Sequence, residues 1–391
     1  MKVTLQPTVL RWARRRARLT AADLGRKLGI KKTPEEQVMQ WEQDGVISYP
    51  RAEKLAATTH TPFGYLFLPE PPEEKLPVAD FRTLGSDEAA QPSPELLDVL
   101  YDAMRKQAWY RDYLIEVGEP RLEFIGAARI EDDATELAQL IREDFKLGVA
   151  LRAEASNWGE ALTLIFEHLE DRGVLVLRSG VADGNPHRPL AVEEFRGFAL
   201  CDPYAPVLFI NTRDSQAAQM FTVAHELVHL WLGLSGVSNP QEGAAQTKRV
   251  ELVCNAVAAE LLVPLNELRS KYEQASHLHD PVAELVRHFK VSSLVILRRL
   301  HDIQALDWET YRKMHREEVE KFRERQARQK EKPGGNYYAT QQVRVGRRFA
   351  RALIGSALEG RTTYREAFGL LGVRKTSTFN ELARKLHFDI R

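Results

Sequence analysis

The residues best suited by type and spacing to metal binding and catalysis are two histidines four residues apart. A glutamate directly follows the first of them. They lie in the segment FTVAHELVHLWLG as His225, Glu226 and His229. Residues four apart share one face of an α-helix, so both imidazoles can bind one tetrahedral metal ion. Glu226 lies at the edge of that face, where its carboxylate can take a proton from a water that the metal activates. The pattern predicts a zinc-dependent peptide-bond hydrolase with Glu226 as its general base.

An ordinary amphipathic helix that carries two histidines is the alternative, because so short a motif also arises by chance. Two neighbouring features favour the metal site. An apolar, β-favouring run, Pro206–Thr212, precedes the motif, and a helix-forming segment with a glutamate, RVELVCNAVAAELL, follows it. In zinc peptidases of this layout a strand at a sheet edge pairs with the substrate backbone. The run Pro206–Thr212 is either that edge strand or an interior strand.

A catalytic zinc ion needs a third protein ligand and an open fourth position. Glu251, 22 residues after His229, is the predicted third ligand. Asn255, one helical turn later, is predicted to hydrogen-bond a histidine and fix its tautomer. Glu260 is the competitor, but it faces elsewhere on a straight helix, so we expect a salt bridge or a cap there. Cys254 is expected to pack in the core. The site is expected to hold one Zn2+ ion and would also accept Mn2+.

Other polar residues are considered for oxyanion stabilisation or for a second metal site, on weaker grounds. The residues considered for stabilising the oxyanion are Tyr204, His187 and Arg196, and the sequence does not choose among them. The segment SHLHD, residues 276–280, carries two histidines in a polar stretch before a proline. Such a stretch indicates a solvated loop rather than a metal cluster.

Length and composition limit the class of protein. A chain of 391 residues indicates about two to four folded units. The content of 43% apolar and 28% charged residues is typical of soluble globular proteins. No apolar run is long enough to cross a membrane, and the first residues do not form a secretion signal. The two cysteines, Cys201 and Cys254, fit a reducing compartment, so we expect a cytoplasmic protein with no membrane partner.

Residues 1–75 predict four or five short helices in the order that helix-turn-helix DNA readers use. Residues 1–32 contain ten Lys or Arg and one acid, Asp23, which indicates double-stranded DNA as a partner. The candidate DNA contacts are Arg14, Arg15, Arg16, Arg18, Gln37 and Gln40. Glu35 and Glu36, at the start of the predicted recognition helix, would repel phosphate. Two alternatives therefore stay open: a solvated basic face, or a domain that docks a protein partner or the chain's own peptidase domain.

The rest of the chain divides by composition. Residues 76–150 predict a proline-rich linker and a helical connector. Residues 151–306 predict an α+β unit with a helix, a small sheet and two more helices. Residues 307–335 predict a charged helix and a linker, and residues 336–391 predict three short helices that form a small domain.

Several of these motifs resemble known families. FTVAHELVHLWLG, followed by VELVCNAVAAELLVP, resembles the ImmA/IrrE family of bacterial and phage metallopeptidases, and the resemblance covers residues 150–305. The N-terminal segment VLRWARRRARLTAADLGRKLGI resembles an Xre-type helix-turn-helix domain. Together they imply a multidomain fold: an all-α helix-turn-helix domain, an α+β gluzincin-like zinc peptidase domain and a small α-helical C-terminal domain.

The resemblance also implies a function, with one zinc ion on His225, His229 and Glu251 and with Glu226 as the base. Members of the family cleave helix-turn-helix repressors, which switches on stress, mobile-element or prophage genes. Fused members are also found beside a toxin-like partner gene, as in toxin–antitoxin or defence pairs. The alternative is a DNA-binding regulator or antitoxin that binds a partner such as a toxin without proteolysis. The sequence does not name the substrate, the cleavage site, the activating signal, the oligomeric state or the role of the C-terminal helices.

Overall fold

The structure, a computed structural model, describes residues 1–80, 91–153, 155–238, 249–275, 280–328 and 345–389. By their internal contacts the residues divide into two compact units. The first unit contains Met1–Pro77 and Leu84–Leu100, and the second contains Val78–Thr83 and Tyr101–Arg391. Among the helices that the structure describes, none combines the length and the apolar composition that a membrane crossing requires.

Helices form most of the first unit. They are α1 (Pro7–Arg16), α2 (Ala21–Lys27), α3 (Pro34–Asp44) and α4 (Tyr49–Thr58). Gly25 lets α2 and α3 approach closely, because a Cβ at this position would lie 2.4 Å from the Pro34 carbonyl oxygen. Two short strands, β1 (Lys2–Thr4) and β2 (Val46–Ser48), pair antiparallel and were not predicted. The helices are present as predicted, while the helix-turn-helix assignment stays a prediction.

The second unit is built on a mixed five-stranded sheet with the order β3-β7-β5-β6-β4. Its strands are β3 (Ala79–Asp80), β4 (Leu175–Ser179), β5 (Gly197–Leu200), β6 (Val207–Asn211) and β7 (Gly236–Ser238). The runs VLVLRS, FRGFALCD and PVLFINT are apolar and β-favouring, which predicts β4, β5 and β6, and the structure confirms these strands. It places β6 between β5 and β4 with all five residues buried, so Pro206–Thr212 contains an interior strand and not the edge strand.

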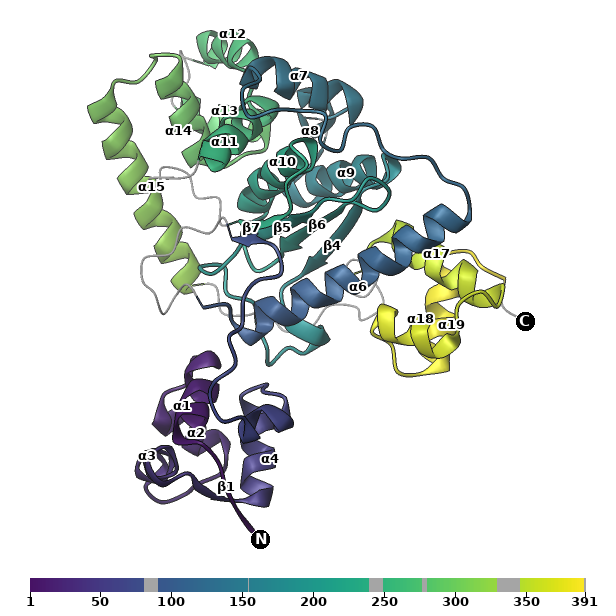
Figure 1. Ribbon diagram of the computed structural model, residues 1–391. Helices are drawn as coiled ribbons and strands as arrows, with labels where there is room; N and C mark the ends of the chain where they lie inside the picture. The colour runs from purple at the N-terminus through teal and green to yellow at the C-terminus, as the bar shows by residue number, and fades with distance from the viewer. Residues whose placement is uncertain (81–90, 154, 239–248, 276–279, 329–344, 390–391) are drawn as a thin grey trace. The chain divides into compact units, whose positions relative to one another are not determined.

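Two amphipathic helices, α9 (Trp158–Asp171) and α10 (Gln216–Trp231), lie on one face of this sheet (Figure 1). α10 contacts β5 and β6, whereas α9 contacts β4. A third helix, α11 (Arg249–Leu262), packs against α10 from the side away from the sheet. The apolar faces of these helices join the inner strands in one hydrophobic core. The histidine motif is therefore part of this core.

The remaining helices complete the two units. In chain order they are η1 (Phe63–Phe67), α6 (Pro94–Glu116), α7 (Ala134–Asp144), α8 (Val149–Ala153), η2 (Ala182–Gly184), α12 (Leu265–Ala275), α13 (Pro281–Phe289), α14 (Ser293–Asp302), α15 (Trp308–Arg328), α17 (Arg347–Leu358), α18 (Tyr364–Leu371) and α19 (Thr376–Lys385). The last three are the short helices predicted near the C-terminus. Arg348 at the start of α17 donates to the Tyr110 hydroxyl at 2.8 Å, and the Arg347 backbone N–H donates to Glu170 at 3.0 Å. These bonds join the C-terminal helices to α6 and α9.

Candidate metal centre

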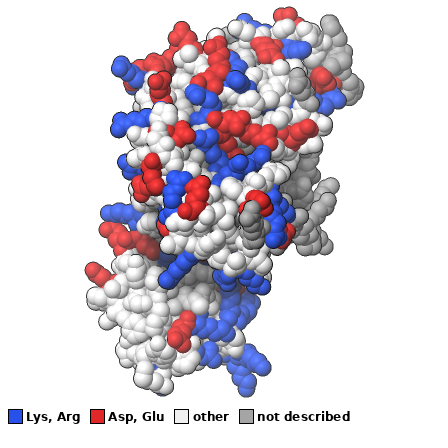
Figure 2. Space-filling view, turned by 90° about the vertical axis from the view of Figure 1, so that its right-hand side faces the viewer, with Lys and Arg blue, Asp and Glu red and all other residues white. Residues whose placement is uncertain are grey.

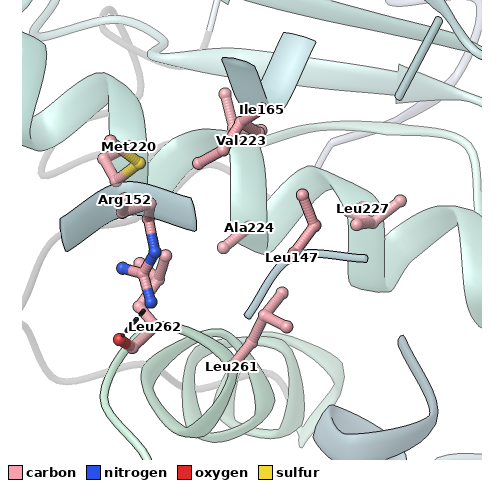
Figure 3. A pocket seen from close by; sticks show the side chains of 9 residues that line it. All are labelled: Leu147, Arg152, Ile165, Met220, Val223, Ala224, Leu227, Leu261 and Leu262. Atoms are coloured by element: carbon pink, nitrogen blue, oxygen red, sulfur yellow. Dashed lines mark hydrogen bonds between the residues drawn. The ribbon is translucent and has the colours of Figure 1, made fainter. Parts of the chain in front are cut away.

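The helix that carries the histidine motif is fixed by burial along its length. Ser215 caps α10 by accepting the Ala218 backbone N–H at 3.2 Å, and every residue from Gln219 to Trp231 is buried. Figure 3 shows apolar side chains of α10 on one side of a small cavity, facing apolar side chains of α11. The cavity is lined by Leu147, Arg152, Ile165, Met220, Val223, Ala224, Leu227, Leu261 and Leu262. Each fully buried aliphatic side chain contributes roughly 1.5–3 kcal/mol to such packing.

A buried arginine fixes the end of α11. Arg152, on α8, is 1% exposed and donates to the Leu262 carbonyl at 2.6 Å (Figure 3) and to the Phe289 carbonyl at 2.9 Å. Burial lowers the pKa of Arg152 to about 10, which leaves the guanidinium charged at neutral pH. These bonds satisfy carbonyls at the ends of α11 and α13, which have no helical partner. The orientation of α11, and of the residues it carries, is thereby held against α10.

Three predicted ligands converge between α10 and α11. Nε2 of His225 lies 3.1 Å from Nε2 of His229. The Glu251 carboxylate reaches both rings, with Oε1 3.1 Å from His229 Nε2 and Oε2 3.3 Å from His225 Nε2. All three residues are 0% exposed. In a tetrahedral site with metal–ligand distances of about 2.0–2.1 Å, neighbouring donor atoms lie about 3.3 Å apart. The donor types and their spacing therefore fit one zinc ion.

Asn255 orients one of the rings. His225 Nδ1 donates to Asn255 Oδ1 at 2.9 Å, which leaves the lone pair of this imidazole on Nε2, the atom that faces the cluster. A hydrogen bond of this kind fixes the tautomer of a metal-binding histidine. The structure thus places Asn255 in the arrangement that the sequence predicts.

The carboxylate of Glu226 is buried beside the cluster without a partner. It is 0% exposed, and neither oxygen has a well-formed hydrogen bond to protein, although the Ser238 hydroxyl lies near enough to interact with the carboxylate. Burial raises the pKa of Glu226 well above its usual value, the nearby Glu251 carboxylate raises it further, and the Ser238 hydroxyl lowers it. An unpartnered buried carboxylate is costly, so its oxygens fit a role in binding a water or a reacting group.

The ionisation of the cluster suits metal binding. Burial opposes ionisation of Glu251, but hydrogen bonds to His225 and His229 outweigh burial and lower its pKa to about 2. Burial also lowers the pKa of His229, although the hydrogen bond to Glu251 acts in the opposite direction. At neutral pH the carboxylate is therefore ionised and the His229 ring is neutral, which are the forms that bind a metal.

Cys254 offers a second composition for the site. Its thiol lies with donor atoms of His225 and His229 in a group whose members are all within 4.8 Å of one another. Cys254 is also part of the apolar core, as predicted. Burial raises the pKa of this thiol well above its usual value, and a metal ligand must be a thiolate. The raised pKa of the thiol favours Glu251 over Cys254 as the third ligand. The Glu251 oxygens also lie only 3.1 and 3.3 Å from the two ring nitrogens.

Two positions beside the cluster were missed from the sequence. Ser238, the last residue of β7, is 0% exposed, and its hydroxyl lies 3.4 Å from His229 Nε2. Gly197, its partner on β5, lies so close to α10 that a Cβ there would be 3.1 Å from Glu226 Cγ. No sequence signal could have found them, because β7 has three residues and its pairing joins distant parts of the chain.

Other predicted positions have contacts elsewhere. Glu260 is ion-paired with Arg299 and also accepts the Leu265 backbone N–H, which confirms the salt bridge and the cap. Tyr204 accepts a hydrogen bond from Arg121 at 3.2 Å, and Arg196 is ion-paired with Asp214 at 2.7 Å.

The remaining weak candidate among the described residues is His187. His187 is exposed in the loop between β4 and β5. The contacts of Tyr204 and Arg196 and the exposure of His187 do not support an oxyanion-stabilising role for any of the three. The two histidines of SHLHD lie outside the described residues.

The candidate DNA contacts of the first unit differ in their surroundings. Arg14 forms a two-point ion pair with Glu42, with its closest oxygen at 2.6 Å. Arg16 pairs in the same way with Glu74. Gln37 donates to Gln40 at 3.3 Å on the surface of α3, and the other two arginines of the set, Arg15 and Arg18, are exposed. Two of the four arginines are thus held by acids of the same unit.

Known proteins share part of this chain. Residues 169–301 match a peptidase family, M78, described as the IrrE N-terminal-like domain, and residues 345–385 match a family described as Domain of unknown function (DUF8813). The chain is 32% identical over 97 residues to the radiation response metalloprotease IrrE of Deinococcus radiodurans. It is 34% identical over 109 residues to the protein of that name from Deinococcus deserti.

These alignments cover 24% and 27% of this chain and 30% and 39% of the two relatives, so the chain spans well under half the length of the curated relatives it matches. No solved structure matches the chain. The matched segment, residues 169–301, contains the donor cluster and Glu226. The chain therefore carries, at residues 169–301, a domain that is similar to the IrrE N-terminal-like family of peptidases.

Proposed function

We propose that this chain is a zinc-dependent, site-specific endopeptidase that cleaves a helix-turn-helix transcriptional repressor and so switches on stress, mobile-element or defence genes. One observation carries the proposal: the donor atoms of His225, His229 and Glu251 converge beside the unpartnered carboxylate of Glu226. Similarity to two radiation response metalloproteases supports a peptidase. The repressor is proposed from the family resemblance of the sequence.

Each residue of the site has its own role in peptide hydrolysis. A zinc ion held by the three ligands would acidify water and polarise the scissile carbonyl. Glu226 accepts the proton of the attacking water and then gives it to the nitrogen of the leaving amine, which completes cleavage of the peptide bond. Burial makes this carboxylate a stronger base than an exposed one. Asn255 keeps His225 in the tautomer that presents Nε2 to the cluster.

The test is a survey of new protein N-termini in cells that carry the wild-type chain or Glu226→Gln, before and after stress or phage challenge. We expect a few termini that need Glu226, inside a DNA-binding protein. Glu226→Gln is the matched control because it removes the base and keeps the three ligands, so both proteins should bind one zinc ion. A wild-type survey with no Glu226-dependent terminus would contradict the peptidase.

A DNA-binding regulator or antitoxin is the second candidate, because of the first unit. Figure 2 shows Lys and Arg side chains gathered on one side of this unit, at the bottom of the view. Exposed arginines such as Arg15 and Arg18 suit phosphate contacts. For this role, Glu226→Gln keeps the cellular phenotype, and Arg15→Ala with Arg18→Ala abolishes it together with binding to duplex DNA. The peptidase predicts the opposite result for Glu226→Gln.

A further inference from the structure

The last described segment of the chain, residues 345–389, is strongly basic. It contains nine Lys or Arg and four Asp or Glu, which gives it a net charge of +5 in a chain whose net charge is zero. The segment lies outside the peptidase-like part, residues 169–301, and contributes nothing to the donor cluster. Positive charge concentrated in one small part of a neutral chain indicates a polyanionic partner.

The three helices of this segment, α17, α18 and α19, pack into a small bundle. Phe379 of α19 is 0% exposed, and its ring centroid lies 5.4 Å from that of Tyr364 and 5.3 Å from that of Phe368, both on α18. α17 lies next to α6 (Figure 1), where Trp109 Nε1 donates to the Thr362 hydroxyl at 3.3 Å. The bundle is thus attached to α6 through α17 and the residues that follow it.

A tight turn connects the last two helices. α18 ends at Leu371 and α19 begins at Thr376, so the turn has four residues. Gly372 opens it with a φ of +66°, in the left-handed region that ends a helix. Two helices joined by a short turn with a glycine form a helix-turn-helix unit. In DNA-binding proteins of this type the second helix lies in the major groove.

α19 has one apolar face and one polar face. Phe379 and Leu382 belong to the buried face. Ser377 and Arg384 are exposed, and Asn380 between them is half-buried. Residues three and four apart lie on the same side of a helix, so these three form one polar stripe. Asn reads adenine and Ser reads several base edges in the major groove, which makes the stripe suitable for contacts with bases.

Exposed cations flank this stripe. Arg374 and Lys375 lie in the turn directly before α19, and Arg384 lies near its end. Over the ranges that the structure describes, these three form no ion pair. Arg14 and Arg16 of the first unit are different, because acids of the same unit hold them. The cations beside α19 can therefore contact phosphate without first breaking an ion pair.

We propose that α18 and α19 bind duplex DNA, with α19 in the major groove. Arg374, Lys375 and Arg384 contact phosphate, and the polar stripe faces the bases. Glu381, the only acid of α19, lies 3.7 Å from Lys385, which offsets its charge. This function is separate from the proposed peptidase and from DNA binding by the first unit, and it stands whether or not the chain cleaves a repressor.

Binding of the full chain to a fluorescein-labelled duplex tests the proposal by anisotropy. The duplex has mixed sequence and about 20 base pairs, roughly two helical turns. The α19 variant combines Arg374→Ala, Lys375→Ala and Arg384→Ala. All three positions are exposed, so the variant should fold, which far-UV circular dichroism checks.

The matched control removes the same three side-chain types from exposed positions of α15. It combines Arg312→Ala, Lys313→Ala and Arg316→Ala. Every protein is also made with Arg15→Ala and Arg18→Ala, so that binding through the first unit is measured separately.

We expect the α19 variant to bind the duplex more weakly than wild type and the α15 control, in both backgrounds. The slope of the logarithm of the binding constant against the logarithm of salt concentration should become shallower by about two to three, because each lost phosphate contact removes about 0.9. Unchanged affinity in the α19 variant, or an equal loss in the α15 control, would overturn the proposal. Equally tight binding of single-stranded RNA of the same length would reject duplex recognition.

Selection from a randomised duplex library tests the placement of α19, in the background that lacks Arg15 and Arg18. Asn380→Ala should reduce the preference at one base pair by roughly 5- to 150-fold and leave the salt slope unchanged. Gln139→Ala, at an exposed amide on α7, is the control and should enrich the same sequences as the background protein. The same sequences enriched by Asn380→Ala would show that α19 does not read the groove.

Discussion

The carboxylate of Glu251 lies 3.1 Å from Nε2 of His229, although 22 residues separate the two in the sequence. The contact joins α11 to α10 through polar atoms that are fully buried, within an otherwise apolar interface. Buried polar groups without strong partners are costly. A shared metal ion would explain why the core tolerates two imidazoles and two carboxylates at this point.

The identity of the third ligand gives the first prediction. Glu251→Gln should weaken zinc binding more than roughly a hundredfold, because losing even an outer-shell partner costs about 10- to 100-fold. Cys254→Ser should leave one zinc ion per chain. Glu260→Gln is the control, since it removes a buried carboxylate from the same helix outside the cluster. Competition with a chromogenic chelator measures the affinities. A loss of zinc in Cys254→Ser with retention in Glu251→Gln would show a His-His-Cys site instead.

Ser238 is predicted to position the reacting groups. Removing its hydroxyl in Ser238→Ala should lower kcat for a cleaved peptide by roughly ten- to hundredfold, because small displacements of catalytic groups have effects of this size. Ser238→Thr keeps a hydroxyl and should restore much of the rate. Ser235→Ala is the matched control, since the Ser235 hydroxyl accepts the Cys201 backbone N–H instead of facing the cluster. Equal rates for Ser238→Ala and Ser235→Ala would contradict the role.

Close packing of β5 against α10 is predicted to require a glycine at position 197, because no side chain fits there. A Cβ there would lie 2.9 Å from the Phe209 carbonyl oxygen and 3.1 Å from Glu226 Cγ, so β5 or α10 must move. Gly197→Ala should lower the free energy of unfolding by about 1–3 kcal/mol, the usual cost of overpacking, and reduce cleavage with zinc still bound. In Gly369→Ala, on α18, the added Cβ has open space, and stability should not fall. Denaturant unfolding and zinc content check both variants.

Glu170 is predicted to make stability depend on pH. Burial raises its pKa, against its hydrogen bonds to Arg347 and Arg348. The folded chain therefore binds this proton more tightly than the unfolded chain does. The resulting stability is present below the unfolded pKa and is lost as pH rises through the folded pKa.

Glu170→Gln removes this titration and keeps an acceptor for the Arg347 backbone N–H. The Tm of the variant relative to wild type should therefore be higher at pH 7 than at pH 4. Glu167→Gln, an exposed position on the same helix, should show no such difference. A Tm difference that does not change with pH would show that the charge of Glu170 is not destabilising.

The sequence by itself determined the features that depend on local geometry. Helical spacing brings His225 and His229 onto one face, and the same periodicity gives α9 and α11. The β-favouring runs that form β4, β5 and β6 are likewise continuous in the sequence. Glu260 lies on the same helix as Glu251, and helical spacing predicted that it faces away from the cluster. Its ion pair with Arg299 confirms this prediction.

The tertiary structure alone decided which distant groups meet. β3 and β7 have two and three residues, too few for a periodic pattern, and their pairing joins residues more than 150 positions apart. Ser238 and Gly197 are unremarkable in the sequence and gain their place only from that sheet. The basic residues near the N-terminus predict a charged surface, yet Arg14 and Arg16 are held by Glu42 and Glu74. Helix periodicity is set by the backbone over a few residues, whereas strand order and ion pairing are set by the packing of the whole unit.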